Sequence, residues 1–290
     1  VNRGGSKGNN TIQKDYFLPS LNLKYNLNDK NSFRLGASKT YTLPQAKEIS
    51  PYRYVGVNFN SQGNPNLKPS DNYNLDLKWD FNPTPTELIS LTAFYKLIKN
   101  PISRIEVASA GGYLSYENIA DKATVAGVEV EIRKNLFVRP VSNAAHGMNK
   151  LSLGLNGSYI YTNAKMPLAT VTTGSQLEGA APWIVNFDLS HNFTKGERSF
   201  VNTLVLNYVS DKIYTIGTQG YQDMMEQGVL TLDFVSQAKL NKHLSLNLKA
   251  RNLLNPSYKL SRKANENGEK VILNDYKKGI NISLGVSCTF

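Results

Sequence analysis

The stretch QGNPNLKPSDNYNLDLKWDF, residues 62–81, changes from a coil rich in Gly, Pro and Asn into strict alternation of apolar and polar residues. On its apolar side lie Tyr73, Leu75, Leu77, Trp79 and Phe81. Residues that alternate with a period of two form a β-strand with one apolar face. Such a face must be covered, either by a second layer of protein or by lipid.

The composition excludes several classes of protein. Of 290 residues, 40% are hydrophobic and 19% are charged, and this chain is too aromatic to be disordered. No segment approaches the roughly 20 continuous apolar residues of a membrane-spanning helix. Cys288 is the only cysteine, which excludes an internal disulfide and a four-ligand zinc cluster.

The net charge of +11 indicates anionic partners. Because the basic residues are scattered and no nucleic-acid motif occurs, we expect no nucleic-acid partner. A phosphate-rich membrane surface or an anionic small ligand fits the charge instead.

Alternation along the rest of the chain predicts about eleven strands. They lie near residues 16–27, 32–40, 72–81, 88–98, 124–137, 150–162, 183–193, 199–210, 229–241, 244–254 and 276–290. Most have the roughly 9–11 residues that a tilted strand needs to cross a bilayer. The sequence therefore predicts an all-β fold.

The connections between these strands alternate in length. Long ones lie near 41–71, 99–123, 163–182, 211–228 and 255–275, short ones such as 28–31, 82–87, 194–198 and 241–243 lie between them, and 138–149 is intermediate. Outer-membrane barrels have short periplasmic turns and longer outer loops, whereas a soluble sandwich has no reason to sort its loops. We therefore predict an antiparallel transmembrane β-barrel.

Aromatic residues support the same prediction. In strand 72–81, Tyr73 lies near one end and Trp79 and Phe81 at the other, with leucines between them. Strand 183–193 is likewise aromatic at both ends. Aromatic girdles around an aliphatic band are typical of a surface that faces lipid. The opposite, polar faces would then line a lumen.

The strand count predicts an incomplete barrel. Eleven strands that begin outside and end in the periplasm cannot close, and an open sheet edge is not tolerated in lipid. We expect residues 1–290 to be the C-terminal part of one barrel domain, about half of a 22-stranded barrel, since eleven is half of twenty-two. The first strands would be absent from this chain.

Several segments resemble the second half of TonB-dependent outer-membrane receptors, of the type found in Bacteroidetes-like bacteria. They are ASKTYTLPQAKEISPYRY (37–54), GNPNLKPSDNYNLDLKW (63–79), LTAFYKLIKNPI (91–102), NIADKATVAGVEVEI (118–132), LEGAAPWIVNFDLSHNF (177–193) and ARNLLNPSYKL (250–260). The alternating end KKGINISLGVSCTF, closing on Phe290, resembles the assembly signal of such barrels. The segments occur in family order along nearly the whole chain.

The resemblance implies a receptor in the outer membrane of a Gram-negative bacterium. It would take up a scarce substrate, such as an iron chelate, vitamin, glycan or peptide, by rearrangement of a plug driven by the TonB complex. In that family the plug is an N-terminal domain, which we expect to be absent from this chain. It implies contact with outer-membrane lipid and lipopolysaccharide, the receptor's own plug domain, and in glycan importers a surface lipoprotein lid. A passive porin and a surface-binding or adhesion barrel without import are the alternatives.

The resemblance also implies where the substrate binds, between inward-facing strand ends and long loops. Aromatic and amide groups suit sugar rings or flat chelates, and arginine suits an anion. The predicted substrate contacts are Tyr52, Arg53, Tyr54, Asn58, Tyr113, Tyr116 and Asn118. In the stretch before strand 72–81, we expect Gly63, Pro65 and Pro69 to set turn dihedrals rather than to bind a ligand.

We predict no catalytic or metal site. His146, His191 and His243 have no metal-ligand spacing, and in DLSH (188–191) the histidine points away from the aspartate and the serine on a strand.

Other charged groups have two possible roles. Glu129, Glu131 and Arg133 are predicted to form a charge ladder in the lumen rather than an acid–base pair. The basic residues Lys259, Arg262, Lys263, Lys270, Lys277 and Lys278 either meet lipopolysaccharide phosphates or belong to a solvated loop. Cys288 shares the apolar parity of its strand and is expected to face lipid.

Overall fold

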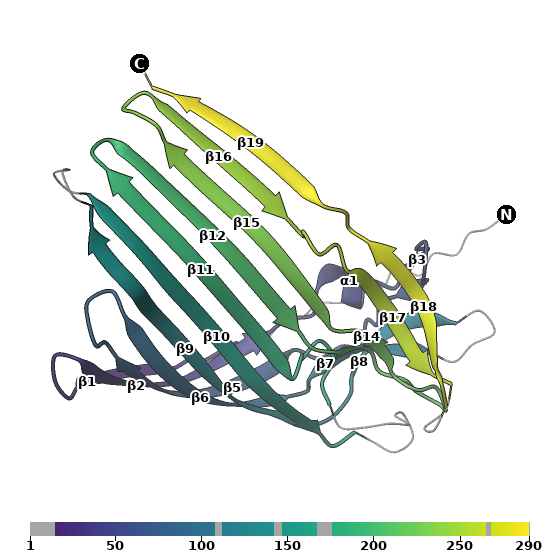
Figure 1. Ribbon diagram of the computed structural model, residues 1–290. Helices are drawn as coiled ribbons and strands as arrows, with labels where there is room; N and C mark the ends of the chain where they lie inside the picture. The colour runs from purple at the N-terminus through teal and green to yellow at the C-terminus, as the bar shows by residue number, and fades with distance from the viewer. Residues whose placement is uncertain (1–14, 108–111, 142–146, 167–175, 265–267, 290) are drawn as a thin grey trace.

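The computed structural model describes residues 15–107, 112–141, 147–166, 176–264 and 268–289. Its largest element is an eleven-stranded antiparallel sheet, the main sheet (Figure 1). In spatial order its strands are β1 (Ser20–Asn26), β2 (Asn31–Thr42), β5 (Ser70–Phe81), β6 (Leu88–Lys99), β9 (Lys122–Pro140), β10 (Met148–Ala164), β11 (Trp183–Lys195), β12 (Arg198–Val209), β15 (Val229–Lys239), β16 (Leu244–Arg251) and β19 (Asn281–Cys288).

Each of the eleven predicted strands corresponds to one strand of the main sheet, so the all-β prediction is confirmed. The predicted start of the last strand is wrong, because residues 270–277 form a strand of another sheet. The two strands are separated at Gly279, whose φ of +78° interrupts extended backbone. Asn255 and Asn252 hold the backbone N–H and carbonyl of this glycine at 3.1 and 2.7 Å. Phe290 and His146 lie outside the described residues.

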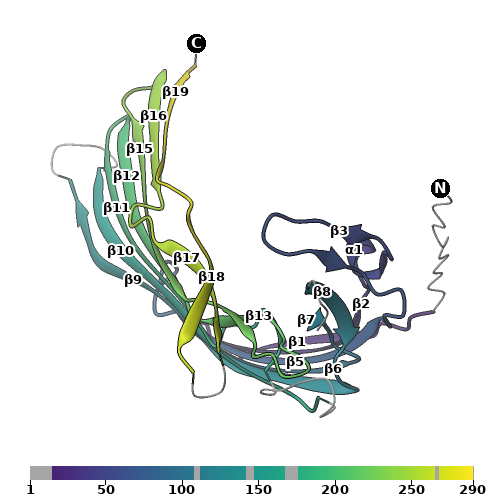
Figure 2. The ribbon, with the colours of Figure 1, turned by 90° about the vertical axis from the view of Figure 1, so that its right-hand side faces the viewer.

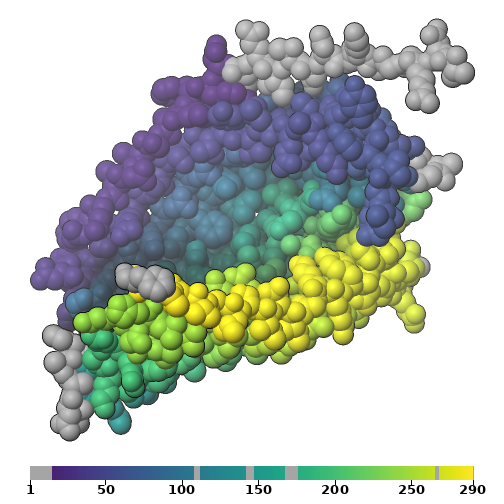
Figure 3. Space-filling model, turned by 90° about the horizontal axis from the view of Figure 1, so that it is seen from above, coloured from purple at the N-terminus to yellow at the C-terminus, as the bar shows by residue number. Residues whose placement is uncertain are grey.

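The connections of the main sheet are sorted as predicted. Short turns such as 27–30, 196–197 and 240–243 lie at one end, the turn end, and the five long connections lie at the other, the loop end (Figure 1). The main sheet is curved into a trough (Figures 2 and 3). Its edges are β1 and β19, and in the described part of the chain these two strands are not paired with each other.

One face of the main sheet is apolar and open to its surroundings. Leu75 and Leu77 are 49% and 52% exposed, and Leu284 of β19 is 72% exposed. Aromatic rings bound this apolar band at both ends. Near the loop end Tyr159 and Trp183 lie with ring centroids 4.7 Å apart, and near the turn end lie the pairs Trp79–Phe81 and Phe193–Phe200.

The opposite face carries a network of polar side chains. Arg133 forms an ion pair with Glu131 at 2.6 Å, and Glu129 accepts a hydrogen bond from the Asn156 amide at 2.7 Å. The network continues from Asn156 to Asn186 of β11 and Asn207 of β12. Two of the three residues of the predicted charge ladder, Glu131 and Arg133, thus form an ion pair, and Glu129 begins a separate chain of hydrogen-bonded side chains across four strands.

The sequence had suggested that the long connections are simple loops. They instead contain two further four-stranded sheets. One sheet has the order β3-β4-β8-β7 and the other β13-β14-β17-β18. These strands are β3 (Arg53–Tyr54), β4 (Ser61–Gln62), β7 (Ile102–Val107), β8 (Tyr113–Asn118), β13 (Lys212–Thr215), β14 (Met224–Glu226), β17 (Ser257–Lys263) and β18 (Lys270–Lys277). The only helix in the described residues is α1 (Ala46–Ile49), and no described helix is long and apolar enough to cross a membrane.

Backbone hydrogen bonds join the two small sheets into one assembly, the loop layer. Ile216, which follows β13, donates its N–H to the Arg104 carbonyl at 3.0 Å and accepts the Glu106 N–H at 3.1 Å. In Figure 2 the strands β3, β7 and β8 of this layer lie on the concave side of the trough.

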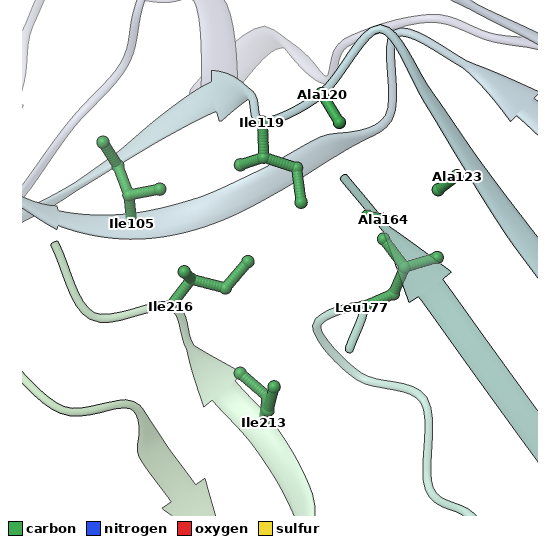
Figure 4. Packing of buried hydrophobic residues seen from close by; sticks show 8 residues of the cluster. All are labelled: Ile105, Ile119, Ala120, Ala123, Ala164, Leu177, Ile213 and Ile216. Carbon is green, nitrogen blue, oxygen red and sulfur yellow. The ribbon is translucent and has the colours of Figure 1, made fainter. Parts of the chain in front are cut away.

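The buried core of the chain lies in the loop layer rather than in the main sheet. Its members are Ile105, Ile119, Ala120, Ala123, Ala164, Leu177, Ile213 and Ile216 (Figure 4). Only Ala123 and Ala164 belong to the main sheet, at the loop ends of β9 and β10. These two alanines share the polar side of their strands. The two alanines pack against the loop layer, which lies on the concave side of the trough. The polar face of the main sheet is therefore the concave face.

The stretch before β5 has a structural role, as predicted, although the reason at Gly63 differs. This residue does not have a positive φ; instead, a Cβ atom there would lie 2.3 Å from the Ser50 carbonyl oxygen and 2.6 Å from that of Lys47. Close approach to the residues around α1 therefore requires glycine. The stretch is tied to β8 because Asn118 accepts the Lys68 N–H at 2.8 Å and donates to the Lys68 carbonyl at 2.9 Å.

Candidate functional site

A cavity of about 640 Å³ opens between the two small sheets of the loop layer. A volume of this size suits a small-molecule ligand. Both sheets contribute side chains, and the loop before β4 and the helix α1 contribute others. The cavity is lined by Lys47, Asn58, Phe59, Ser61, Arg104, Leu114, Tyr116, Tyr214, Glu226, Tyr258, Lys259, Leu260, Asn274 and Tyr276.

Arg104 of β7 is held rigidly in the cavity wall. Its guanidinium donates to the Glu178 carboxylate at 2.9 Å, and its backbone N–H donates to the same carboxylate. The guanidinium also lies over the Tyr214 ring, 4.3 Å from the centroid, in a cation–π contact. Its Nε is buried and has no acceptor among the described residues. The ion pair and the cation–π contact therefore fix the orientation of this arginine beside an aromatic surface.

Aromatic rings form much of the remaining lining. Tyr258 of β17 and Tyr276 of β18 are stacked with centroids 5.5 Å apart, and the Lys278 ammonium lies 3.7 Å from the Tyr258 centroid. On the other side, Phe59 lies 6.5 Å from Tyr214. Flat aromatic surfaces facing a cavity favour ligands that present a ring face or an apolar plane.

Burial changes the acid–base behaviour of groups around the cavity. It raises the pKa of the Tyr116 phenol, while the charge of Arg104 opposes that rise. It also raises the pKa of the Glu178 carboxyl against the opposing hydrogen bonds and charge of Arg104. The tyrosine stays a neutral hydroxyl at neutral pH, able to donate and accept hydrogen bonds.

The charges of the cavity are mostly paired. Lys212 pairs with Glu226 at 3.4 Å, and Lys259 lies 3.9 Å from Asp275. Lys47 is the exception: its ammonium lies over the Tyr54 ring at 5.4 Å, and it has no ion pair within the described ranges. The lining therefore combines aromatic rings, amides and a small excess of positive charge.

The structure brings two of the seven predicted contacts, Asn58 and Tyr116, into the cavity lining. Arg53 instead lies over the Tyr113 ring at 4.7 Å, and these two residues, with Tyr52 and Tyr54, are outside the lining. The Asn118 side chain is engaged with backbone groups of Lys68 and Asn100. Substrate contact by all seven stays a prediction.

Sequence reasoning did not find Arg104, Tyr214, Tyr258 and Tyr276. Each lies on a strand of four to eight residues within a long connection. A weak signal was present at Tyr276, because NDYK (274–277) contains a tyrosine between polar residues. These strands are shorter than a membrane-spanning strand and were therefore interpreted as loop.

Other charged groups have partners of their own. His191 contacts the Asn149 side chain at 2.8 Å rather than Asp188 or Ser190, and Ser190 bonds Thr203 at 3.0 Å. Several of the basic residues near the end of the chain are also engaged within the loop layer. Lys259 and Lys270 pair with Asp275 and Asp211, Arg262 pairs with Glu106, and Lys278 contacts Tyr258.

The sorted connections, the aromatic girdles and the open apolar face define an outer-membrane β-barrel. Over residues 1–253 the chain matches the family model described as TonB dependent receptor-like, beta-barrel. The chain belongs to this family of TonB-dependent receptors, as its segments had indicated, and its location is the outer membrane of a Gram-negative bacterium. The loop end is therefore extracellular and the turn end periplasmic.

Individual relatives agree with the family. An iron-regulated outer membrane virulence protein of Vibrio cholerae is 24% identical over 240 residues, which are 79% of this chain and 34% of that protein. The fold is similar to a mutant of the ferric enterobactin receptor of Pseudomonas aeruginosa (TM-score 0.56, 18% identity) and to the ferric yersiniabactin uptake receptor of Yersinia pestis (TM-score 0.59, 16% identity). These matches cover 94% of this chain and 40% and 37% of the two receptors. The chain spans about a third of the curated relative's length.

Membrane location gives the apolar face a measurable consequence. Leu77→Lys is expected to destabilise the barrel by about 2–4 kcal/mol, because an ammonium near the bilayer midplane loses its hydration. Val271 of β18 has nearly the same exposure, 50% against 52%, but it belongs to the loop layer. Val271→Lys should change stability by no more than about 0.5 kcal/mol. Denaturant unfolding of the full-length receptor in vesicles measures both, and equal effects would contradict the lipid-facing assignment.

Proposed function

We propose that this chain forms the C-terminal part of a receptor that takes up a scarce substrate through the outer membrane. The observation that carries the proposal is the cavity at the extracellular end, formed by side chains from four separate long connections. Such a cavity holds a ligand before it crosses the membrane. Energy from the TonB complex would then rearrange a plug in the lumen and admit the ligand.

The completeness of the barrel is part of the same proposal. The edges β1 and β19 would be open in lipid, where unpaired backbone groups are costly. Further strands of the whole protein would pair with both edges and close the barrel. The polar side chains of this face, including Glu129 and Arg133, would then face the plug.

The cavity suits some substrates better than others. Rings at Tyr214, Tyr258 and Tyr276 and the Lys47 ammonium favour a flat, partly anionic ligand, such as an iron chelate. The names of the Vibrio and Pseudomonas relatives, which refer to iron regulation and to a ferric chelate, point in the same direction. Vitamins, glycans and peptides are the other substrate classes to test, and a lipoprotein lid would accompany a glycan.

The role proposed here is transport without catalysis. A passive porin would admit substrate without energy, and an adhesion barrel would bind a partner without import. The cavity favours uptake over the porin because a binding site at the mouth retains a dilute ligand. Accumulation of substrate that depends on membrane energy distinguishes an uptake receptor from an adhesion barrel.

The test is uptake of radiolabelled ferric enterobactin, cobalamin, an oligosaccharide and a peptide by cells expressing the full-length receptor. We expect one probe to accumulate, and accumulation to stop when a protonophore removes the membrane energy. Uptake that persists without energy would indicate a porin, and binding without accumulation would indicate an adhesion barrel.

Cavity variants connect this uptake to the proposed site. The double change Tyr258→Ala and Tyr276→Ala should lower uptake at low substrate concentration by about fivefold or more, because each lost aromatic contact contributes roughly 0.5–1.5 kcal/mol. Tyr25→Ala with Tyr161→Ala, on the outer face of β1 and β10, is the matched control. An equal loss in both variants would contradict the cavity as the binding site.

A further inference from the structure

A second feature at the extracellular end lies on the lipid-facing side, away from the cavity. It consists of Lys39 on β2, Asp71 and Tyr73 on β5, Lys99 on β6 and Lys122 on β9, which we call the rim site. These four strands are consecutive in the main sheet (Figure 1).

Strand register places the members of the rim site side by side. Lys39 is opposite Tyr73, Asp71 is opposite Lys99, and Lys99 is opposite Lys122. All five share the face of Leu75, Leu91 and Val128, whose side chains are about half exposed on the apolar side. Because every member lies near the loop end of its strand, the rim site is located where the outer leaflet meets water.

Two ammonium groups converge on one ring. The Lys39 ammonium lies 5.6 Å from the Tyr73 centroid, and the Lys99 ammonium lies 5.3 Å from it. The aromatic ring lies at a membrane interface, where tyrosine is favoured. Within the described ranges, Asp71 is the only acidic residue in an ion pair with either lysine, and it lies 3.7 Å from Lys39.

The pairing of Lys99 with Lys122 is unfavourable by itself. Like charges at directly opposite positions of neighbouring strands destabilise a sheet. Lys99 and Lys122 are both exposed. Lys165, which comes directly after Ala164 at the loop end of β10, is exposed as well. The three lysines of the rim site, Lys39, Lys99 and Lys122, exceed its one aspartate, so the rim site has a net positive charge on a surface otherwise suited to lipid.

We propose that the rim site binds the phosphate groups of a lipopolysaccharide molecule in the outer leaflet. Phosphate oxygens accept hydrogen bonds from the converging ammonium groups and offset the repulsion between Lys99 and Lys122. The acyl chains of the lipid lie along the apolar band below, against Leu75 and its neighbours. The basic residues of β17 and β18 are mostly paired within the loop layer, so the rim site has the better placed cations.

The test uses the full-length receptor in phosphatidylcholine nanodiscs, titrated with bis-phosphorylated lipid A. The variant with Lys39, Lys99 and Lys122 changed to Gln should bind lipid A about 100-fold more weakly, since each basic residue near an anionic surface contributes roughly fivefold. The matched control changes Lys30, Arg139 and Lys195, three exposed basic residues at the turn end, to Gln and should bind normally. A variant with arginine at the three rim positions should also retain binding.

Three results would overturn the proposal. One is equal binding by the rim variant and the control, and another is equal binding of dephosphorylated lipid A by the unchanged receptor. The third is complete displacement of lipid A by millimolar inorganic phosphate, which would show a site for the free ion. Native mass spectrometry of the receptor distinguishes these results by the mass that is retained.

A second measurement separates lipid binding from surface solvation. In phosphatidylcholine alone, Lys122→Gln should raise the midpoint of thermal unfolding, because it removes the repulsion with Lys99. With lipid A present the same change should lower the midpoint, because it removes a phosphate contact. A change of the same sign in both lipids would contradict the proposal, whether or not the receptor transports any substrate.

Discussion

Ile216→Ala is expected to destabilise the loop layer by about 2–5 kcal/mol, the cost of truncating a large aliphatic side chain in a packed core. Ile216 is only 1% exposed and lies in the cluster with Ile105 and Ile213 (Figure 4). Its backbone also joins the two small sheets. A cavity at this position would therefore loosen both sheets, and the substrate cavity between them, while the main sheet keeps its own backbone pairing.

Hydrogen exchange of the full-length receptor in a membrane measures this effect. Amides of β7, β8 and β13 should exchange faster in the variant, and amides of β10 and β11 should not. Ile272→Ala is the matched control, because Ile272 of β18 is 46% exposed and its truncation should cost no more than about 0.5 kcal/mol. If both variants exchange alike, the loop layer does not depend on this core.

Arg262→Met is expected to destabilise the loop layer by about 3–5 kcal/mol, because it leaves the Glu106 carboxylate buried without its counter-charge. The two side chains form an ion pair between β17 and β7 and are only 15% and 14% exposed. The Arg262 guanidinium also lies 5.2 Å from the Tyr221 centroid. This contact connects the two small sheets, so its loss should weaken their association.

A double-mutant cycle isolates the pair. Combining Arg262→Met with Glu106→Leu should restore most of the lost stability, since replacing both partners by apolar groups leaves no buried charge. Lys242→Met is the control at the exposed Lys242–Glu197 pair, 71% and 54% exposed, and should cost no more than about 1 kcal/mol. If the double variant is as unstable as Arg262→Met, packing rather than charge explains the loss.

The main sheet was predictable from the sequence because its rules are local. Tyr73, Leu75 and Leu77 alternate with polar residues inside one strand, and each strand contacts the next one in the main sheet. Alternation and connection length therefore predicted all eleven strands and the sorting of their connections. The error at the last strand has a local cause too: the left-handed backbone of Gly279 interrupts an alternating run, which composition alone does not show.

The candidate site was only partly predictable. Asn58 and Tyr116 were identified because aromatic and amide groups in long loops suggest ligand contact. Arg104 and Tyr214 come from connections about 110 residues apart in the chain, and their contact depends on how two small sheets associate. No local period predicts such an association, because strands of four to six residues are too short to specify their partners.

The strands, their two faces, the sorting of the connections and the family all follow from the amino-acid pattern, because a strand with lipid on one side and a polar interior on the other alternates apolar and polar residues. The position of the buried core, the long connections that enclose the cavity and the lysines that meet at the rim emerge only from the three-dimensional arrangement. These features depend on side chains from distant segments that pack or pair across strands. Their energies arise from burial and charge in three dimensions, which a one-dimensional pattern does not contain.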